Sequence, residues 1–194
     1  IKDVVARDSV NTLDVMVDNI NHELNTLNSK IEYFFVGGST ENPSGTCIVV
    51  KNGTNGYICD FGVDTTVTAL RNCLVENSIF NIKGLIISHY HNDHIGGITG
   101  EGIQTLLNDQ RFTFNGCKAY LPHRNIEWLR FVGDAHDHLR VAEDVIRNLL
   151  IDKNIEIVYP IENQEFILDD DLSVKFNNLS AAYFNGYYDY TLNG

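Results

Sequence analysis

Apolar residues in the first part of the chain recur every three or four positions, while the residues between them are mostly Asn, Asp, Thr and Glu. This spacing predicts a helix over residues 1–30 with one narrow apolar stripe, which is the a/d seam of a coiled coil. Self-association is favoured, with a parallel trimer preferred, although an amphipathic helix folded back on its own domain remains an alternative. The stripe consists of Ala6, Val10, Leu13, Val17, Ile20, Leu24, Leu27 and Ile31.

The pattern changes after residue 30, where short apolar runs alternate with helix-length segments, so residues 31–194 are predicted to form a separate domain that contains both strands and helices. The first strand is expected at 31–36, and the run Leu85-Ile86-Ile87 reads as a buried strand. The acidic triplet at 169–171 is either a metal clip or a hairpin turn with solvated charges, and the turn is favoured. The other predicted elements are helices at 64–77, 101–108, 125–131 and 136–151, and strands at 118–121, 155–159, 165–168 and 172–176.

Directly after the buried strand comes the sequence Ser-His-Tyr-His-Asn-Asp-His-Ile-Gly-Gly, from Ser88 to Gly97. Because alternate residues at a strand end project to the same side, His89 and His91 can share one metal ion. The following turn brings Asp93 and His94 to a second position beside it. Divalent ions held by imidazole and carboxylate lower the pKa of a bound water and supply hydroxide for hydrolysis.

Two other interpretations of this motif are a solvated loop that happens to be rich in histidine and a purely structural metal site. Structural zinc prefers four closed ligands, usually including cysteine. None of the four cysteines lies in the motif, which argues against a structural site.

The pattern His89-x-His91-x-Asp93-His94, after an apolar strand and before Gly-Gly, resembles the signature of the metallo-β-lactamase superfamily. The resemblance extends backwards to Thr46–Val50, Asn52-Gly53 and Tyr57–Gly62, which are similar to the hairpin and the "strand-Asp-x-Gly" segment that precede the motif there. It implies an α+β fold, the αββα sandwich of that superfamily, of which this chain would hold the first part. It also implies zinc, as one or two ions with manganese or iron as alternatives, bound by His89, His91, Asp93 and His94.

The same resemblance implies roles for individual residues. Asp93 would act in catalysis together with a metal-bound hydroxide. Asp60 stands at the end of the predicted strand that precedes the motif, a position from which it can accept a hydrogen bond from a metal-binding imidazole, although a helix or turn cap is an equal alternative for Asp60. The family usually adds a third histidine downstream, a bridging Asp and a final histidine. No histidine follows His138, so the motif is expected to be half of an active site unless His123 or another residue substitutes.

Two weaker sequence resemblances concern the substrate and the larger assembly to which the protein would belong. Phe35-Val-Gly-Gly-Ser-Thr40 partly resembles the Asp-Val-Gly-Gln-Gly-Asp of the branch that includes DNA-internalisation competence proteins and teichoic-acid phosphorylcholine esterases, but lacks both acids. Asp3–Val10 resembles helical connectors of phage baseplate and tail-appendage proteins. Together these likenesses imply a phosphodiesterase that acts on a cell-wall polymer such as teichoic acid.

Composition narrows the choice of partners and location. A net charge of −12 without a basic run makes long nucleic acid a less natural substrate. Cys47, Cys59, Cys73 and Cys117 are expected to be reduced, and no membrane-length apolar run is visible. Residue 1 is Ile rather than Met, so a fragment of a longer protein is expected. The protein is expected in the virion or outside the cell after assembly in a host cytoplasm, and otherwise in the cytoplasm.

Three functions therefore remain open from the sequence. The leading one is a metal-dependent phosphodiesterase. The alternative is a non-catalytic structural or host-binding component of a trimeric phage appendage, in which the metal site is degenerate. A third is a cytosolic thiolester hydrolase or nuclease with its helix packed in cis, which would be a monomer.

Overall fold

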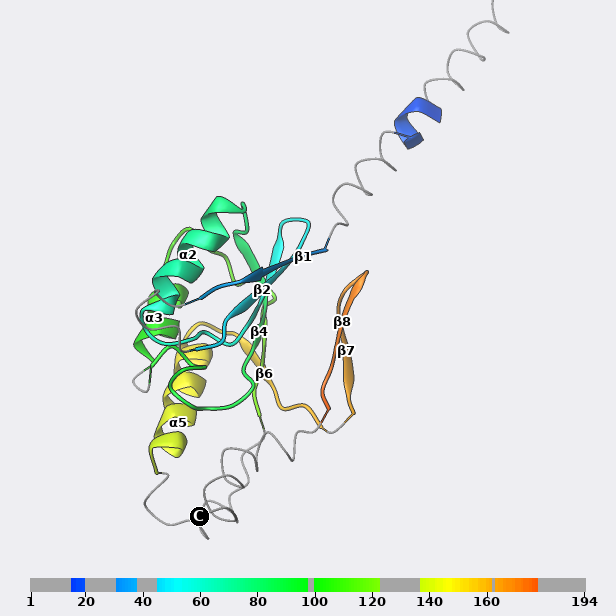
Figure 1. Ribbon diagram of the computed structural model, residues 1–194. Helices are drawn as coiled ribbons and strands as arrows, with labels where there is room; N and C mark the ends of the chain where they lie inside the picture. The colour runs from blue at the N-terminus through cyan, green and yellow to red at the C-terminus, as the bar shows by residue number, and fades with distance from the viewer. Residues whose placement is uncertain are drawn as a thin grey trace, which may run out of the picture.

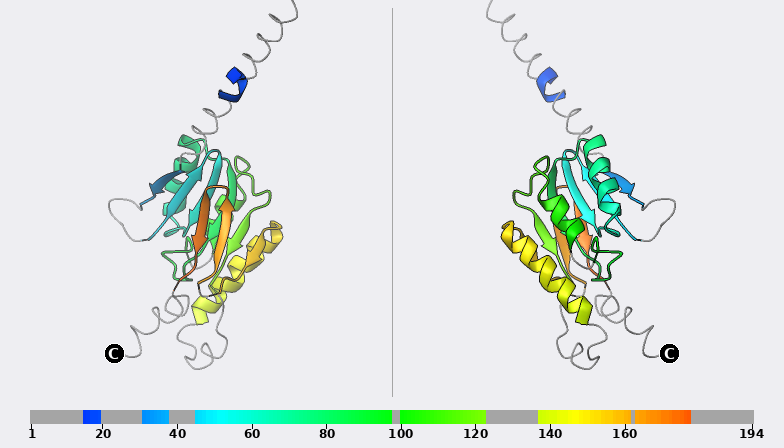
Figure 2. Two further views of the ribbon diagram at one scale, coloured as in Figure 1. Left: turned by 90° about the vertical axis from the view of Figure 1, so that its right-hand side faces the viewer. Right: turned by 90° about the vertical axis from the view of Figure 1, so that its left-hand side faces the viewer.

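The computed structural model describes residues 15–19, 31–37, 45–97, 100–122, 137–161 and 163–177. A six-stranded sheet lies at the centre, helices α2, α3 and α5 cover one face, and the hairpin β7–β8 lies against the other (Figures 1 and 2). The strands are β1 (Ile31–Phe35), β2 (Ile48–Asn52), β3 (Asn55–Cys59), β4 (Asn81–Ile86), β5 (Lys118–Tyr120), β6 (Glu156–Val158), β7 (Glu165–Asp169) and β8 (Leu172–Lys175). The helices are α2 (Thr66–Glu76), α3 (Glu101–Leu107) and α5 (Asp137–Asp152).

The main sheet keeps the order β1-β2-β3-β4-β5-β6, with β1, β2 and β3 antiparallel and β3 to β6 parallel. Parallel neighbours need a crossover, and α2 lies between β3 and β4 in the chain while α5 lies between β5 and β6. As a result the carboxyl ends of β3, β4 and β5 meet at one edge of the sheet. This edge is the usual position for a ligand site in an open α/β sheet.

The face of the sheet under the helices is a continuous apolar row. Val49 pairs with Ile58, and Ile58 pairs with Leu85, and each is at most 1% exposed. Helix α2 supplies Val67 and Leu70 to the same core. Each buried aliphatic side chain of this kind contributes roughly 1.5–3 kcal/mol, so this row and the helices hold the central strands together.

The opposite face packs on the hairpin through aromatic and polar contacts. Tyr57, 2% exposed, donates from its hydroxyl to the carbonyl of Leu168 at 2.9 Å and lies 3.2 Å from a carboxylate oxygen of Asp169. Asn55 donates to the same carboxylate oxygen at 3.0 Å. Tyr120 and Phe166 place their ring centroids 5.0 Å apart. The acidic triplet is therefore a hairpin turn, as predicted, but Asp169 is held by the sheet and is not simply solvated.

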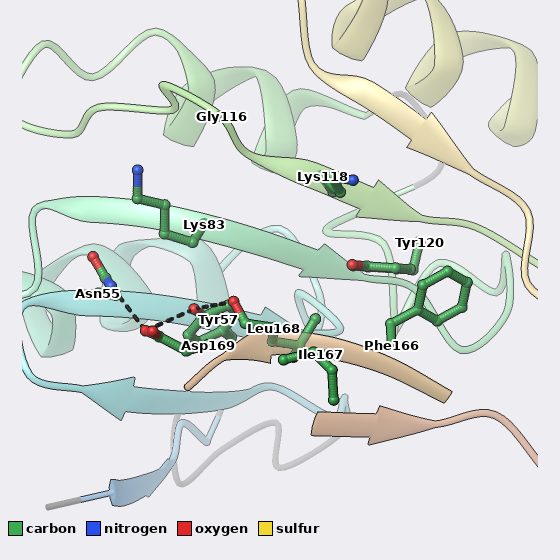
Figure 3. Close-up of a pocket in the computed structure, with 10 residues that line it drawn as sticks. All are labelled: Asn55, Tyr57, Lys83, Gly116, Lys118, Tyr120, Phe166, Ile167, Leu168 and Asp169. Carbon is green, nitrogen blue, oxygen red and sulfur yellow. Dashed lines mark hydrogen bonds between the residues drawn. The ribbon is translucent and has the colours of Figure 1, made fainter. Parts of the chain in front are cut away.

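A cavity of about 290 Å³ lies between the sheet and the hairpin (Figure 3). Its polar lining includes Asn55, Lys83 and Lys118, near the amino ends of β3, β4 and β5. This is the end of the strands opposite to Ser88, so the cavity is separate from the histidine motif.

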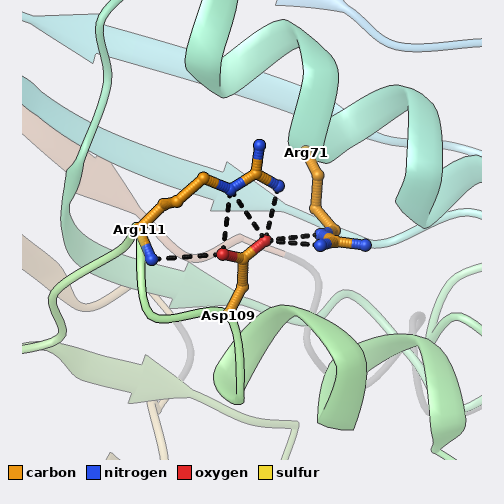
Figure 4. A network of polar contacts seen from close by, with 3 residues as sticks. All are labelled: Arg71, Asp109 and Arg111. Atoms are coloured by element: carbon orange, nitrogen blue, oxygen red, sulfur yellow. Dashed lines mark hydrogen bonds and ion pairs between the residues drawn. The ribbon is translucent and has the colours of Figure 1, made fainter.

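An ion-pair network joins α2 to the segment after α3 (Figure 4). Asp109, whose side chain is 6% exposed, accepts from the guanidinium of Arg71 at 2.6 Å and from that of Arg111 at 2.6 Å. The hydrogen bonds from Arg111 and from Arg71 hold the pKa of Asp109 well below its usual range. The carboxylate therefore fixes the position of α3 relative to α2.

The predicted α+β fold class is confirmed, and the described helices and strands lie within a few residues of their predicted positions. Residues 15–19 are helical, with Val15, Met16 and Val17 all more than half exposed. The rest of the predicted coiled coil, the predicted helix at 125–131 and the side chains of His123, His136 and His138 lie outside the described residues. All four cysteines carry free thiols in the structure, and burial raises the pKa of Cys59 to about 11. None of the described helices is long and apolar enough to span a membrane.

Candidate metal centre

The histidine motif begins where the chain leaves β4. The amide of Ile87 still donates to the carbonyl of Tyr120 at 3.0 Å, and the next residue, Ser88, is exposed. The neighbouring strand β3 ends one residue before Asp60, whose amide donates to the carbonyl of Ile86 at 2.8 Å. The register of the parallel strands thus places Asp60 beside the start of the motif.

Backbone hydrogen bonds bind the motif to the loop that follows β3. Phe61 donates to the carbonyl of His94 at 2.7 Å, and Gly96 donates to the carbonyl of Gly62 at 2.8 Å. A third bond runs from the amide of Thr46 to the carbonyl of Asp93 at 3.2 Å. Since the bonds hold the chain at both 93–94 and 96, the turn that carries the motif is fixed by the sheet scaffold.

The structure brings the three imidazoles of the motif together. The ring centroids of His89 and His94 lie 3.9 Å apart, and those of His89 and His91 lie 4.7 Å apart. An oxygen of Asp93 lies 3.8 Å from Nε2 of His94. The four residues predicted as ligands therefore form one cluster at the carboxyl end of β4.

The buried carboxylate of Asp60 accepts hydrogen bonds from two residues of the motif, His94 and Ser88. Its carboxylate, 7% exposed, accepts from Nδ1 of His94 at 2.8 Å through Oδ2 and from the amide of Ser88 at 2.7 Å through Oδ1. Asp60 itself has a φ of 58°, a left-handed conformation that Asp adopts more readily than most residues. Its carboxylate thus lies against the motif, which is the position that a supporting residue of a metal-binding imidazole would need.

Ser88 is a member of the cluster to which the sequence assigned no function. Its hydroxyl lies 2.7 Å from Oδ2 of Asp60, 2.9 Å from Nδ1 of His89 and 3.4 Å from Nδ1 of His94. In the sequence, the one feature that could have pointed to a role for Ser88 is its position next to His89 at a strand end. Its contact with Asp60 arises from the register of β3 against β4, which brings the two side chains within hydrogen-bond distance.

The electrostatics of the cluster favour an uncharged His89. Burial, followed by the charges of His94 and His91, lowers the pKa of His89 to about 4. Burial also lowers the pKa of His94, but the hydrogen bond and charge of Asp60 outweigh it, so that the pKa of His94 is raised. At neutral pH His89 is therefore in the form that can bind a metal.

The types of ligand atom in the cluster, imidazole nitrogens and a carboxylate oxygen, suit a divalent ion such as zinc or iron. With Nδ1 of His94 bound to Asp60, its Nε2 is the nitrogen left for a metal, and imidazole with carboxylate is a usual ligand set for such ions. As placed, however, no three His, Cys, Asp or Glu side chains within the described ranges form a group that could hold an ion. The cluster therefore fits a metal in chemistry, but it is an incomplete ligand set.

Residues 41–100 match the family model described as "Metallo-beta-lactamase superfamily". No curated protein sequence gives a significant match. Among solved structures, the chain resembles a Thermotoga maritima protein assigned to the metallo-beta-lactamases, with 17% identity, a TM-score of 0.43, and coverage of 71% of this chain and 62% of that one.

Two further structures show the same level of similarity. The metallo-beta-lactamase fold protein YhfI of Bacillus subtilis has 14% identity and a TM-score of 0.44, with 72% of this chain and 49% of that chain covered. The chemotaxis sensor ODP, solved with a peroxy diiron species, has 16% identity and a TM-score of 0.40, with 71% and 44% covered. The chain thus spans about half to three fifths of the length of these proteins. The family model, which covers the hairpin, Asp60 and the whole histidine motif, supports a place for residues 41–100 in the metallo-β-lactamase superfamily.

Proposed function

We propose that this chain carries part of the active site of a metal-dependent hydrolase that cleaves phosphodiesters. The observation that carries the proposal is the cluster of three imidazoles beside Asp93, supported by the buried carboxylate of Asp60. Such a cluster at the carboxyl end of a strand is more than a histidine-rich surface loop, because its side chains contact one another and a buried partner.

His89 and His91 would hold one ion, and Asp93 and His94 a second. Zinc is preferred, with manganese or iron as alternatives. A bound divalent ion would polarise the substrate and supply hydroxide at neutral pH. The chain's own contribution is positional: Asp60 holds the Nδ1 proton of His94, which leaves Nε2 for the metal, and Asp93 lies beside that nitrogen.

A cell-wall polymer such as teichoic acid is the proposed substrate. The proposal draws on the partial likeness of Phe35–Thr40 to the branch that includes phosphorylcholine esterases.

The N-terminal seam is proposed to join chains into a trimer, as in an appendage of a phage particle that meets the host surface. Val17, the one seam residue among the described residues 15–19, is 53% exposed, so it is open to contact with a partner helix. Location in the virion, or outside the cell after assembly in a host cytoplasm, follows from that setting.

A second candidate is a structural or host-binding component of such an appendage, with a metal site that has lost its function. The specific observation in its favour is the incomplete ligand set within the part of the chain that the structure describes. It predicts a protein that neither retains nor binds zinc.

Metal analysis and hydrolysis assays separate the two candidates. The protein is purified without chelator, its metal content is measured, and it is then saturated with zinc or manganese and tested on bis-p-nitrophenyl phosphate and teichoic acid. The phosphodiesterase proposal expects bound metal and cleavage that His91→Ala abolishes, while the exposed Asn92→Ala leaves cleavage intact. Bound metal without cleavage of either substrate would contradict the phosphodiesterase, and absence of any zinc affinity would favour the scaffold.

A further inference from the structure

We infer that Ser88 is a positioning residue that passes the effect of Asp60 on to His89, so that one buried carboxylate sets the protonated nitrogen of two of the proposed metal ligands. The inference rests on the proposed function insofar as these histidines are ligands. It goes beyond that function by assigning a role to a residue outside the ligand set.

The first step is the direction of the Ser88 hydroxyl. Its oxygen lies 2.7 Å from Oδ2 of Asp60, a distance that requires a proton between the two oxygens. A carboxylate only accepts, so the serine must donate its single proton to Asp60. The amide of Ser88 donates to the other carboxylate oxygen at 2.7 Å and holds the two residues in this arrangement.

The second step concerns His89. Because the Ser88 hydroxyl has given its proton to Asp60, it can only accept from Nδ1 of His89, which lies 2.9 Å away. Nδ1 of His89 must therefore carry the proton, and Nε2 is left with the lone pair that a metal needs.

The third step joins the two histidines. Oδ2 of Asp60 also accepts from Nδ1 of His94 at 2.8 Å, so both rings carry the proton on Nδ1: His94 donates directly to Asp60, and His89 donates to the Ser88 hydroxyl that Asp60 holds. The distance of 3.4 Å between the Ser88 hydroxyl and Nδ1 of His94 reflects their shared acceptor. The result is a chain of hydrogen bonds from His89 through Ser88 to Asp60, with His94 as its second branch.

The tautomer can be measured without any metal. Long-range ¹H–¹⁵N correlation of the histidine rings, in the metal-free 194-residue chain at pH 7.5, reports which nitrogen carries the proton. We expect the Nδ1–H form for His89 and His94 in the natural protein. In Ser88→Ala we expect His89 to shift toward the Nε2–H form while His94 keeps its Nδ1 proton. Ser88→Thr, which retains the hydroxyl, should restore the Nδ1–H form of His89.

Zinc affinity, measured by calorimetry, is the second readout. Loss of a hydrogen bond that orients a ligand typically costs about 10–100-fold in metal affinity, so we expect Ser88→Ala to bind zinc at least about tenfold more weakly and Ser88→Thr to bind almost as tightly as the natural protein. Ser173→Ala, which removes an exposed hydroxyl bound to Glu165 on the hairpin, is the matched control and should change neither readout.

The two proposals fail in different ways. A natural protein that binds no zinc would remove the proposed function, while the tautomer of His89 would still decide the role of Ser88. An Nε2–H form of His89 in the natural protein, or a tautomer and affinity unchanged in Ser88→Ala, would overturn the inference and leave the hydrolase proposal standing.

Discussion

Gly45 occupies a position where an added methyl group would meet only backbone. Its φ is +108°, and a Cβ built there lies 2.9 Å from the carbonyl oxygen of Asp93, from Cα of Gly62 and from the amide nitrogen of Val63. None of these atoms can rotate away, unlike the end of a flexible side chain. Gly45→Ala must therefore either move the loops that carry the motif or accept a severe overlap.

The cost can be worked out from two contributions. A left-handed conformation costs a non-glycine residue roughly 1–2 kcal/mol, and overpacking of a tight site costs roughly 1–3 kcal/mol. The smaller entropy of the unfolded chain offsets about 0.4–1 kcal/mol. We expect Gly45→Ala to lower the free energy of unfolding by about 1–4.5 kcal/mol, a large share of the stability of an ordinary domain.

Gly116→Ala provides the matched control. Gly116 also has a positive φ, +70°, but its added Cβ would have no heavy atom within 4 Å. Only the conformational cost applies, without overpacking, so we expect a loss of about 0–1.5 kcal/mol. Urea unfolding followed by far-UV circular dichroism should show a much lower midpoint for Gly45→Ala at an unchanged slope. Equal losses of unfolding free energy in the two variants would refute the close approach of Gly45 to the backbone of Asp93 and of Gly62–Val63.

Three further predictions concern the hairpin, the ion-pair network and the arm. Tyr57→Phe removes the hydroxyl that anchors β7–β8, and we expect a loss of about 1–2 kcal/mol in urea unfolding and faster amide exchange in the hairpin. Asp109→Asn should cost about 1–2 kcal/mol at pH 7. Because the pKa of Asp109 is lowered on folding, this stabilisation is present above the unfolded value near 4 and declines as the pH falls below it, so the two proteins should converge in acid. Val17→Glu places a charge on the proposed seam, and we expect sedimentation to show single chains in place of a trimer.

Each of these has a control of the same chemical kind. Tyr33→Phe changes a tyrosine that is 59% exposed, and Asp152→Asn changes an exposed carboxylate, so neither should alter stability by more than about 0.5 kcal/mol. Met16→Glu introduces the same charge one residue off the seam and should leave the oligomer intact. A natural protein that sediments as a monomer, or a Tyr33→Phe loss equal to that of Tyr57→Phe, would contradict the corresponding prediction.

The elements of the fold were predictable because their signals are local. The apolar spacing of α2, with Val67, Leu70 and Leu74 on one face, and the buried run of β4 are contained within single short segments. The motif from His89 to His94 was predictable for the same reason, since all its residues lie within six consecutive positions shortly after a strand.

The contacts that support the motif were not predictable in the same way. Asp60 and Ser88 are 28 residues apart in the sequence, and Tyr57 and Asp169 are 112 residues apart. Such pairs depend on which strands become neighbours and in which register they pair. Neither property can be predicted from the sequence of one short segment alone. Asp60 was a candidate because a strand ends there, but Ser88 had no signal that separated it from any serine at a turn.

The site therefore depends on strand register more than on the motif itself. Cys59 lies opposite Ile86, and the residue that follows Cys59, Asp60, binds Ser88, two residues after Ile86. A slip of one residue would turn the side chains of β4 to the opposite face and separate Asp60 from Ser88. Two features oppose such a slip: the buried pair Ile58 and Leu85, and Gly84, where an added Cβ would lie 2.7 Å from the ring of Tyr57. The apolar core under the helices thus does more than stabilise the sheet, because it fixes the register on which the tautomers of His89 and His94 rest.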